Sequence, residues 1–344
     1  MLSQRTETIL RSIVEQYISR AVPVPSQSVL NNYELNVSSA TIRSEMAHLE
    51  QEGYIIRPHT SAGSVPSDKG YRYYVESLDE ITLPLNQQRM ISHIFHQVET
   101  KLEEWVTLTA RILADMTQNM AIVVMPKPVK CRYKYLEIVT LRDNIALIVL
   151  VLHGAKIKQQ LVTLDELPYQ SDLFTITNKL NHLYSDKTEA EISDEETELT
   201  PLETQIKDCL LRIMEDEDNA EYVGPYLDGL HFMFNQPEFT DTERVIALME
   251  LTERQNLLKV ILPHRESKQG VQVFIGKENE SEVIQNCSVI ISEYGLPKEA
   301  MGNLAIIGPT RMPYARCIAS IDYLSSLLSV LICKLYGKKE EDPS

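Results

Sequence analysis

The hydrophobic positions of the first 80 residues repeat with a helical period in three successive stretches. Residues 4–20 carry isoleucine, leucine, valine and tyrosine on one face, which predicts a helix stopped by the two prolines that follow. A short second helix is expected with Ser26 as its N-cap. A third is expected from Ser38 or Ser39 to Gly53, because its apolar side chains recur at steps of three and four residues and glycine commonly ends a helix.

A hairpin pattern follows the third helix. Residues 54–57 are strand-like, Gly63 lies in a turn, and the chain then returns as a second strand. Ser67 can cap a tyrosine-rich helix, and Pro84 marks a boundary just after that helix. Three helices and a hairpin therefore form one candidate domain at the start of the chain.

The rest of the chain alternates helical and strand-like stretches. One continuous helix is expected over 87–119, where the apolar side chains keep to a single stripe, and a last helix over 313–336. Residues 168–252 are expected to be mainly helical and are strongly acidic. Strands are expected at 133–141, 144–152, 156–164, 257–262, 271–275, 287–293 and 303–308.

Charge changes this picture only once it is located along the chain. The formal net charge is −16, but residues 1–75 hold seven Lys/Arg and seven Asp/Glu, so the excess acidity lies entirely after them. A neutral head on an acidic body should bind non-specific DNA weakly. The five cysteines are scattered, and the longest apolar run, 145–152, is too short to cross a bilayer. These features predict a soluble, cytoplasmic protein with no membrane partner.

The order of three helices and a hairpin is typical of a winged helix-turn-helix, whose third helix lies in the major groove of DNA. Arg43 on that helix can contact guanine O6 and N7 with both arms of its guanidinium. Arg57 and His59 would lie beside phosphates or the minor groove, while Lys69 and Arg72 would contact the DNA backbone. The candidate DNA-binding residues are Ser26, Gln27, Ser38, Ser39, Thr41, Arg43, Ser44, Arg57, His59, Ser61, Gly63, Lys69 and Arg72. The alternative is a small three-helix module whose surface serines and arginines have no special role.

Three separated blocks of sequence resemble one family. Residues 37–43 read Val-Ser-Ser-Ala-Thr-Ile-Arg and, with the Met-Ala and Leu-Glu pairs that follow, look like the recognition helix of the heat-inducible transcription repressor HrcA family. Residues 58–75 resemble that family's wing and following helix. Residues 308–312, Gly-Pro-Thr-Arg-Met, with Tyr314 and residues 321–324, resemble its C-terminal signature. The three blocks occur in the family's order, and the total length fits.

The resemblance implies an α+β multidomain fold in three parts. These are a winged helix-turn-helix over 1–81, a GAF-like α/β domain over 82–128 and 251–344, and a dimerisation domain inserted over 129–250. An insertion that starts only after residue 164 is the alternative. The resemblance also implies a homodimer that binds double-stranded operator DNA at an inverted repeat, the CIRCE element, and represses chaperone operons. It further implies that the chaperonin GroEL modulates this activity.

The chain departs from the family pattern at three positions. The wing usually has arginine where this chain has Ser64, and the third helix often has proline and usually asparagine where this chain has Ser39 and Ser44. Ser64 removes one phosphate or minor-groove contact from each subunit. We therefore expect weaker operator binding or an altered operator.

A ligand-sensing regulator is the first competing interpretation, because GAF-like folds often hold small molecules. Arg311, which follows Gly308 and Pro309, could bind an anion, although a structural salt bridge is the commoner role.

An enzyme is the second competing interpretation, and the motifs argue against it. The sequence has no glycine-rich phosphate loop, no His-Glu-x-x-His and no nucleophile elbow. His153, His231 and His264 are isolated from one another in sequence. The acidic run at 216–218 lacks the alternating ligand spacing of a calcium loop. We expect no catalytic residue, no cofactor and no metal.

Overall fold

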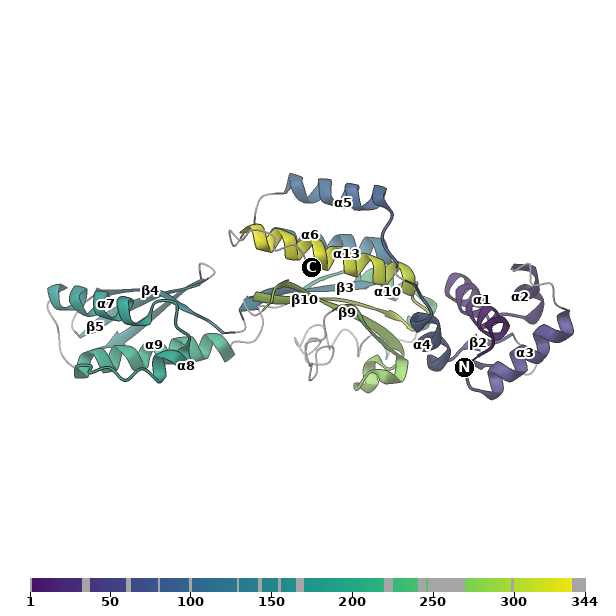
Figure 1. Ribbon diagram of the computed structural model, residues 1–344, viewed down its shortest axis with the longest axis horizontal. Coiled ribbons are helices and arrows are strands. Elements are labelled where there is room, and N and C mark those ends of the chain that lie inside the picture. Colours follow the sequence, from purple (N-terminus) through teal and green to yellow (C-terminus); the bar gives the residue numbers. More distant parts are fainter. Residues whose placement is uncertain are drawn as a thin grey trace. The chain divides into compact units, whose positions relative to one another are not determined.

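The structure is a computed structural model of a mixed α/β chain (Figure 1). Its described residues are 2–32, 38–59, 63–79, 81–98, 101–128, 130–141, 144–153, 156–164, 170–219, 225–240, 246, 270–297 and 300–335. They contain three β-sheets. The chain divides into a first unit, Met1–Pro126 with Val223–Gly295 and Gly302–Ser344, and a second unit, Lys127–Tyr222 with Leu296–Met301.

The first unit begins with the three predicted helices, α1 (Gln4–Arg20), α2 (Ser26–Asn32) and α3 (Ser39–Gln51). Ser3 caps α1 by accepting a hydrogen bond from the backbone N–H of Thr6 at 3.2 Å. The apolar stripe of each helix turns inward. The buried side chains of this small core include Ile9, Leu10, Ile13, Val14, Val29, Ile42, Met46 and Leu49.

The predicted hairpin is confirmed as two short antiparallel strands, β1 (Ile55–Ile56) and β2 (Val65–Pro66). Helix α4 (Asp68–Glu76) follows at once, and the Ser67 side chain caps it by accepting from the N–H of Gly70 at 3.1 Å. We call residues 2–79, which contain α1 to α4 and both strands, the N-terminal module.

A five-stranded sheet, the central sheet, forms the core of the rest of the first unit. Its strand order is β7-β3-β10-β9-β8. The strands are β3 (Met120–Pro128), β7 (Tyr226–Asp228), β8 (Gln272–Ile275), β9 (Cys287–Leu296) and β10 (Ala300–Pro309). Helices α6 (Leu102–Thr117) and α13 (Tyr314–Leu335) lie along one face (Figure 1). The other face packs on Met233 of α10 (Leu230–Phe234) and Phe239 of the 3-10 turn Pro237–Phe239.

The sequence-based account of the first unit has one wrong helix and omits one strand. The single helix expected over 87–119 is two helices, α5 (Leu85–Gln97) and α6, because the backbone at Val98 turns extended (φ −90°, ψ 145°). The apolar stripe continues across this break, so periodicity could not show it. Strand β3 was also missed, although its β-branched run is buried in the central sheet. The strand expected at 257–262 lies outside the described residues.

Helix α13 is the one described helix long and apolar enough to cross a membrane by length and composition. Leu324, Leu328 and Ile332 on it are fully buried inside the first unit, which accounts for its apolar character. Cys317 is also buried there, and burial raises the pKa of its thiol to about 12, as expected for a structural cysteine.

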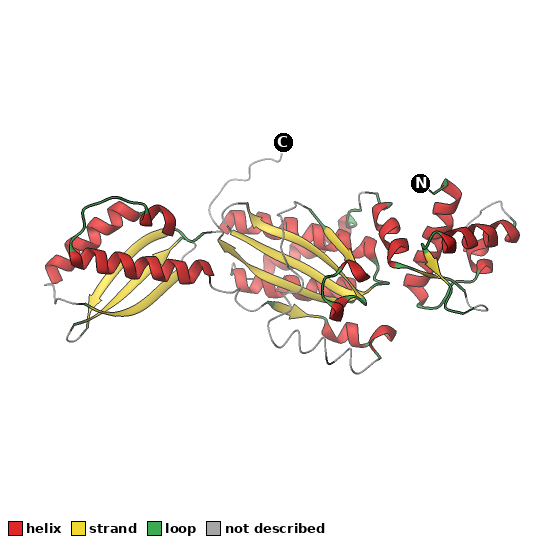
Figure 2. Cartoon of the chain, turned by 90° about the horizontal axis from the view of Figure 1, so that it is seen from below, coloured by secondary structure: helices red, strands yellow, loops and turns green. Residues whose placement is uncertain are grey.

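The second unit is a three-stranded antiparallel sheet in the order β4-β5-β6 with helices on one face (Figure 2). The strands are β4 (Tyr133–Thr140), β5 (Ile145–Leu152) and β6 (Lys156–Thr163), as predicted. The helices are α7 (Gln170–Tyr184), α8 (Glu189–Ser193) and α9 (Pro201–Asn219). Their apolar side chains, such as Leu180 and Leu210, share one core with the inward residues of the sheet.

The main stretch of the second unit begins at Lys127, close to the first of the two expected starts of the insertion, and ends at Tyr222. Strands β4 to β6 belong to the second unit, so this unit does not start after residue 164. It also stops before residue 250, because Leu227 of β7 pairs with Ile122 of β3 in the central sheet. The long acidic stretch has no hydrophobic periodicity that could mark where the chain returns from the second unit to the central sheet.

A buried carboxylate ties α9 to the edge strand β6. Glu217 is 4% exposed at its side chain and contacts the ammonium groups of Lys156 and Lys158, the latter at 2.5 Å. Burial alone would raise the pKa of Glu217, but the hydrogen bonds from the two lysines outweigh it, so the pKa is lowered. A lowered native pKa means that this stabilisation is complete above the unfolded pKa and is lost as pH falls through the native pKa.

Glu217→Gln is expected to lower the free energy of unfolding at pH 7 by about 1–3 kcal/mol, because it leaves two ammonium groups without their carboxylate. The loss should shrink as pH falls below about 4, where the wild-type carboxylate becomes protonated too. Urea unfolding followed by circular dichroism at both pH values measures this. Asp216→Asn, an exposed neighbour, is the control. An equal loss at both pH values would contradict the assignment.

Candidate nucleic-acid interface

Helix α3 presents a polar face to solvent because its apolar face is used up in the core. Ser39, Arg43 and Ser44 are exposed, together with the neighbouring Ala40 and Ala47. Small side chains on either side of one arginine let the helix approach a partner closely. The guanidinium of Arg43 has no hydrogen bond or ion pair with any described residue, so its donors are available.

The first turn of α3 is organised by its cap. Ser38 accepts a hydrogen bond from the N–H of Thr41 at 3.2 Å, and the two hydroxyls lie 3.0 Å apart. Both predicted site residues therefore shape the start of the helix as well as lying beside its exposed face.

Polar contacts fix the orientation of α2 and α3 on α1. Glu45 of α3 accepts a hydrogen bond from the Thr6 hydroxyl at 2.8 Å. Gln16 of α1 holds α2 through a short hydrogen bond from the Ser28 hydroxyl. Ser26 and Gln27, at the start of α2, are half-buried and exposed respectively. The exposed face of α3 thus sits on a fixed support.

The hairpin is hydrogen-bonded to the segment between α1 and α2. Ser64 and Val24 exchange two backbone hydrogen bonds of 2.8 and 2.9 Å. A Cβ at Gly63 would lie 2.4 Å from the carbonyl carbon of Val24, so only glycine allows this approach. The Ser64 side chain is buried, so an arginine there would have to leave the base of the hairpin rather than simply extend from it.

The basic residues around the hairpin differ in whether their side chains have hydrogen-bond or ion-pair partners within the protein. Arg57 is exposed and pairs with Glu50 at 3.2 Å, and His59 is exposed. Lys69 donates to the carbonyl of Glu52 at 2.7 Å and lies over the Tyr54 ring, so its charge serves the C-terminal end of α3. Ser61 lies outside the described residues.

Arg72 has partners inside the protein. Its side chain is half-buried, pairs with Glu278 and donates to the carbonyl of Val273 at 2.6 Å. The sequence predicted a contact of this residue with the DNA backbone, and the structure adds these contacts within the chain. Sequence reasoning also missed His48, which is exposed on the last turn of α3, four residues after Ser44.

The second unit carries a separate apolar surface, which we call the outer face. It is the side of the β4-β5-β6 sheet that no described helix covers, where Leu161 is 61% exposed and Ile157 is 59% exposed. Cross-strand pairs such as Leu147 with Leu161 and Val151 with Ile157 form apolar rows on it, and Glu137 and Gln159 lie beside Val149 between these rows. Its members are Tyr135, Val139, Ile145, Leu147, Val149, Val151, Ile157 and Leu161.

Comparison with known proteins places this geometry in a family. The family model described as HrcA protein C terminal domain matches residues 103–318. The heat-inducible transcription repressor HrcA of Dehalococcoides mccartyi is 48% identical over 98% of both chains. That of Roseiflexus castenholzii is 38% identical over 98% of this chain and 96% of the relative. The chain belongs to the HrcA family of heat-inducible transcription repressors.

One solved structure, a crystal structure of a hypothetical protein, shares the fold. The match covers 97% of this chain and 98% of that protein, with a TM-score of 0.59 at 22% identity.

The residues of the HrcA C-terminal signature have a structural role. Arg311 contacts Glu238 and Gln236, and it donates to the carbonyl of Ile18 at the end of α1 at 3.3 Å. The anion-binding interpretation of Arg311 is not supported, because its donors meet protein acceptors on every side.

Gly63→Ala is expected to lower the free energy of unfolding by about 1–3 kcal/mol, because the new methyl group meets backbone atoms that cannot rotate away. Urea unfolding measures the change. Ala47→Ser, on the exposed face of α3, should stay within about 0.5 kcal/mol of wild type. A Gly63→Ala variant as stable as wild type would show that the hairpin base is looser than described.

Proposed function

We propose that this HrcA-family repressor binds an inverted-repeat operator of the CIRCE type as a homodimer, and that residues 1–81 form a winged helix-turn-helix. The observation that carries the proposal is the exposed face of α3, where an arginine without a partner among the described residues lies between small side chains. A helix of this kind fits the major groove with its N-terminal half against base edges.

The roles within the module follow from the partners of each side chain. Arg43 reads guanine through two parallel hydrogen bonds, while Ser39, Thr41 and Ser44 contact neighbouring bases or phosphates. The module is positioned on phosphates or in the minor groove by a second set of residues. These are Ser26, Gln27, Ser38, Arg57, His59, Ser61 and the backbone of Gly63. Lys69 and Arg72 act inside the protein instead.

The charge distribution supports specific rather than general DNA binding. Residues 1–75 are neutral while the remainder carries the full −16, so few phosphates are neutralised and the acidic remainder repels the duplex. Affinity therefore depends on correct base contacts made by two modules at once.

We place the dimer contact on the outer face of the second unit. An inverted repeat presents two equivalent half-sites related by a two-fold axis, which calls for an isologous dimer. A largely apolar sheet face can pack against the same face of a second copy, which removes side chains such as Ile157 and Leu161 from water.

The remaining parts of the proposal come from the family. The central sheet with α5, α6 and α13 corresponds to the expected GAF-like domain. The chaperonin GroEL modulates the active fraction of the repressor.

Fluorescence anisotropy with a labelled CIRCE-type duplex tests the DNA-binding proposal. Wild type should prefer this duplex to a scrambled one, with affinity falling as salt rises. Arg43→Ala should lose about 10- to 100-fold in affinity and relax the preference at one base pair. Arg57→Ala should weaken binding equally on every sequence, and GroEL should raise the active fraction.

Equal binding of wild type to both duplexes, with and without GroEL, would contradict the operator proposal. Equal losses from Arg43→Ala on the operator and on the scrambled duplex would instead assign Arg43 to the backbone.

Leu161→Glu is expected to convert the dimer to monomer in sedimentation velocity, because it places a charge in the proposed apolar contact. Gln160→Glu adds the same charge to the same strand on the opposite side of the sheet and should leave the dimer intact. Matching circular dichroism spectra verify that both variants fold. A Leu161→Glu protein that stays dimeric would move the interface elsewhere.

A further inference from the structure

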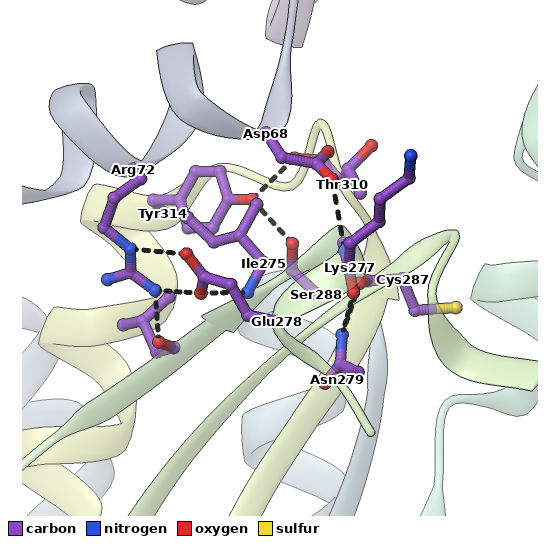
Figure 3. A network of polar contacts seen from close by, with 12 residues as sticks. Asp68, Arg72, Ile275, Lys277, Glu278, Asn279, Cys287, Ser288, Thr310 and Tyr314 are labelled. Carbon is purple, nitrogen blue, oxygen red and sulfur yellow. Dashed lines mark hydrogen bonds and ion pairs between the residues drawn. The ribbon is translucent and has the colours of Figure 1, made fainter. Parts of the chain in front are cut away.

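Helix α4 is shared between two packing environments. Tyr71 and Tyr74 are buried, and Gly70 sits so close to the strand side of the module that a Cβ there would lie 2.2 Å from the Tyr54 carbonyl oxygen. Asp68 and Arg72, on the same short helix, instead reach the segment after β8 in the central-sheet part of the first unit (Figure 3). One helix thus completes the N-terminal module and attaches it.

The first attachment is a fork-to-fork ion pair. Both arms of the Arg72 guanidinium contact the Glu278 carboxylate, with Nε 2.9 Å from Oε1, and Nη2 also donates to the Val273 carbonyl. The N–H of Ile275 donates to the other oxygen of Glu278 at 2.8 Å, which fixes the carboxylate (Figure 3). The hydrogen bond with Glu278 raises the pKa of Arg72. Such bidentate pairs set direction as well as distance.

The second attachment is a carboxylate on a tight turn. Asp68 accepts a hydrogen bond from the N–H of Lys277 at 3.1 Å (Figure 3). Gly276 has φ +55°, and a Cβ on it would lie 2.3 Å from the Asp68 carboxylate, so the turn needs glycine for its conformation and for this approach.

The third attachment comes from the HrcA C-terminal signature. Arg311 donates to the carbonyl of Ile18 on α1, and the rest of its guanidinium donates to Glu238 and Gln236. Its side chain is only 13% exposed. Nearby, the rings of Tyr71 and Tyr314 lie 5.8 Å apart. The anchors therefore fall on two different helices of the module.

We propose that Asp68, Arg72 and Arg311 are positioning residues that clamp the N-terminal module to the central-sheet part and so determine which half-site spacing the dimer accepts. The proposal rests on the proposed function. Anchors on α1 and on α4 oppose rotations that either one alone would leave free. Two modules held in fixed directions match one separation of half-sites, and modules free to turn would lose orientational freedom on binding the operator.

Binding of Glu238→Ala/Glu278→Ala protein to a series of duplexes tests the clamp, since both changes lie outside the N-terminal module. The duplexes carry the inverted repeat at its natural spacing, with one or two base pairs added or removed, or as a single half-site. Wild type should prefer the natural spacing. The variant should lose about tenfold there, keep single half-site affinity within about threefold, and show a flattened spacing preference. Glu282→Ala, an exposed neighbour, is the control.

An exchange of charges separates the clamp from a direct DNA contact. Arg72→Glu alone should flatten the spacing preference, and adding Glu278→Arg should restore it. Loss of single half-site affinity that the second change does not restore would assign Arg72 to the DNA backbone and overturn the proposal. An unchanged spacing preference in the double-alanine variant would also overturn it.

Calorimetry without DNA keeps the clamp testable if the operator proposal itself fails. The N-terminal module and the central-sheet part should unfold in one transition in wild type and in two transitions in the double-alanine variant. A single transition in both proteins would overturn the clamp, whereas failure of wild type to prefer the inverted repeat would overturn only the operator proposal.

Discussion

The close approach of α4 to two partners at once is the constraint on which the first unit depends. Gly70 lets the helix touch the Tyr54 carbonyl, and Arg72 leaves the same helix to pair with Glu278. A nine-residue helix with caps alone would be marginal in water, so its stability comes from both packing partners. The direction of α3 is consequently linked to the central sheet through α4 and, via Arg311, through α1.

Sequence reasoning succeeded where local signals and tertiary packing agree. Ser38 and Ser67 cap helices as their positions suggest, and the alternating strands β4 to β6 appear where expected. It failed where local signals are silent. The break at Val98 lies within an unbroken apolar stripe, and β7 is a three-residue strand whose only cue is its distant partner β3.

The candidate interface shows the same division. The exposed face of α3 followed from burying Ile42, Met46 and Leu49, which is a local inference. Arg72 and Glu278 are 206 residues apart in sequence, and Arg311 and Ile18 are 293 apart. No local sequence pattern predicts such partners. Basic residues beside a candidate DNA-binding helix are thus divided between contacts with a ligand and contacts that orient the module, and only the structure separates the two groups.

Native-state hydrogen exchange of the wild-type protein measures how firmly α1 and α4 are held to the central sheet, because it compares the opening of the N-terminal module with that of the central sheet in the same molecule. We expect the slowest amides of α1 and α4 to open with the same free energy as those of β9 and β10, and low denaturant to lower these opening free energies together. Exchange of α1 and α4 through an opening of much lower free energy, while β9 and β10 stay protected, would contradict this expectation.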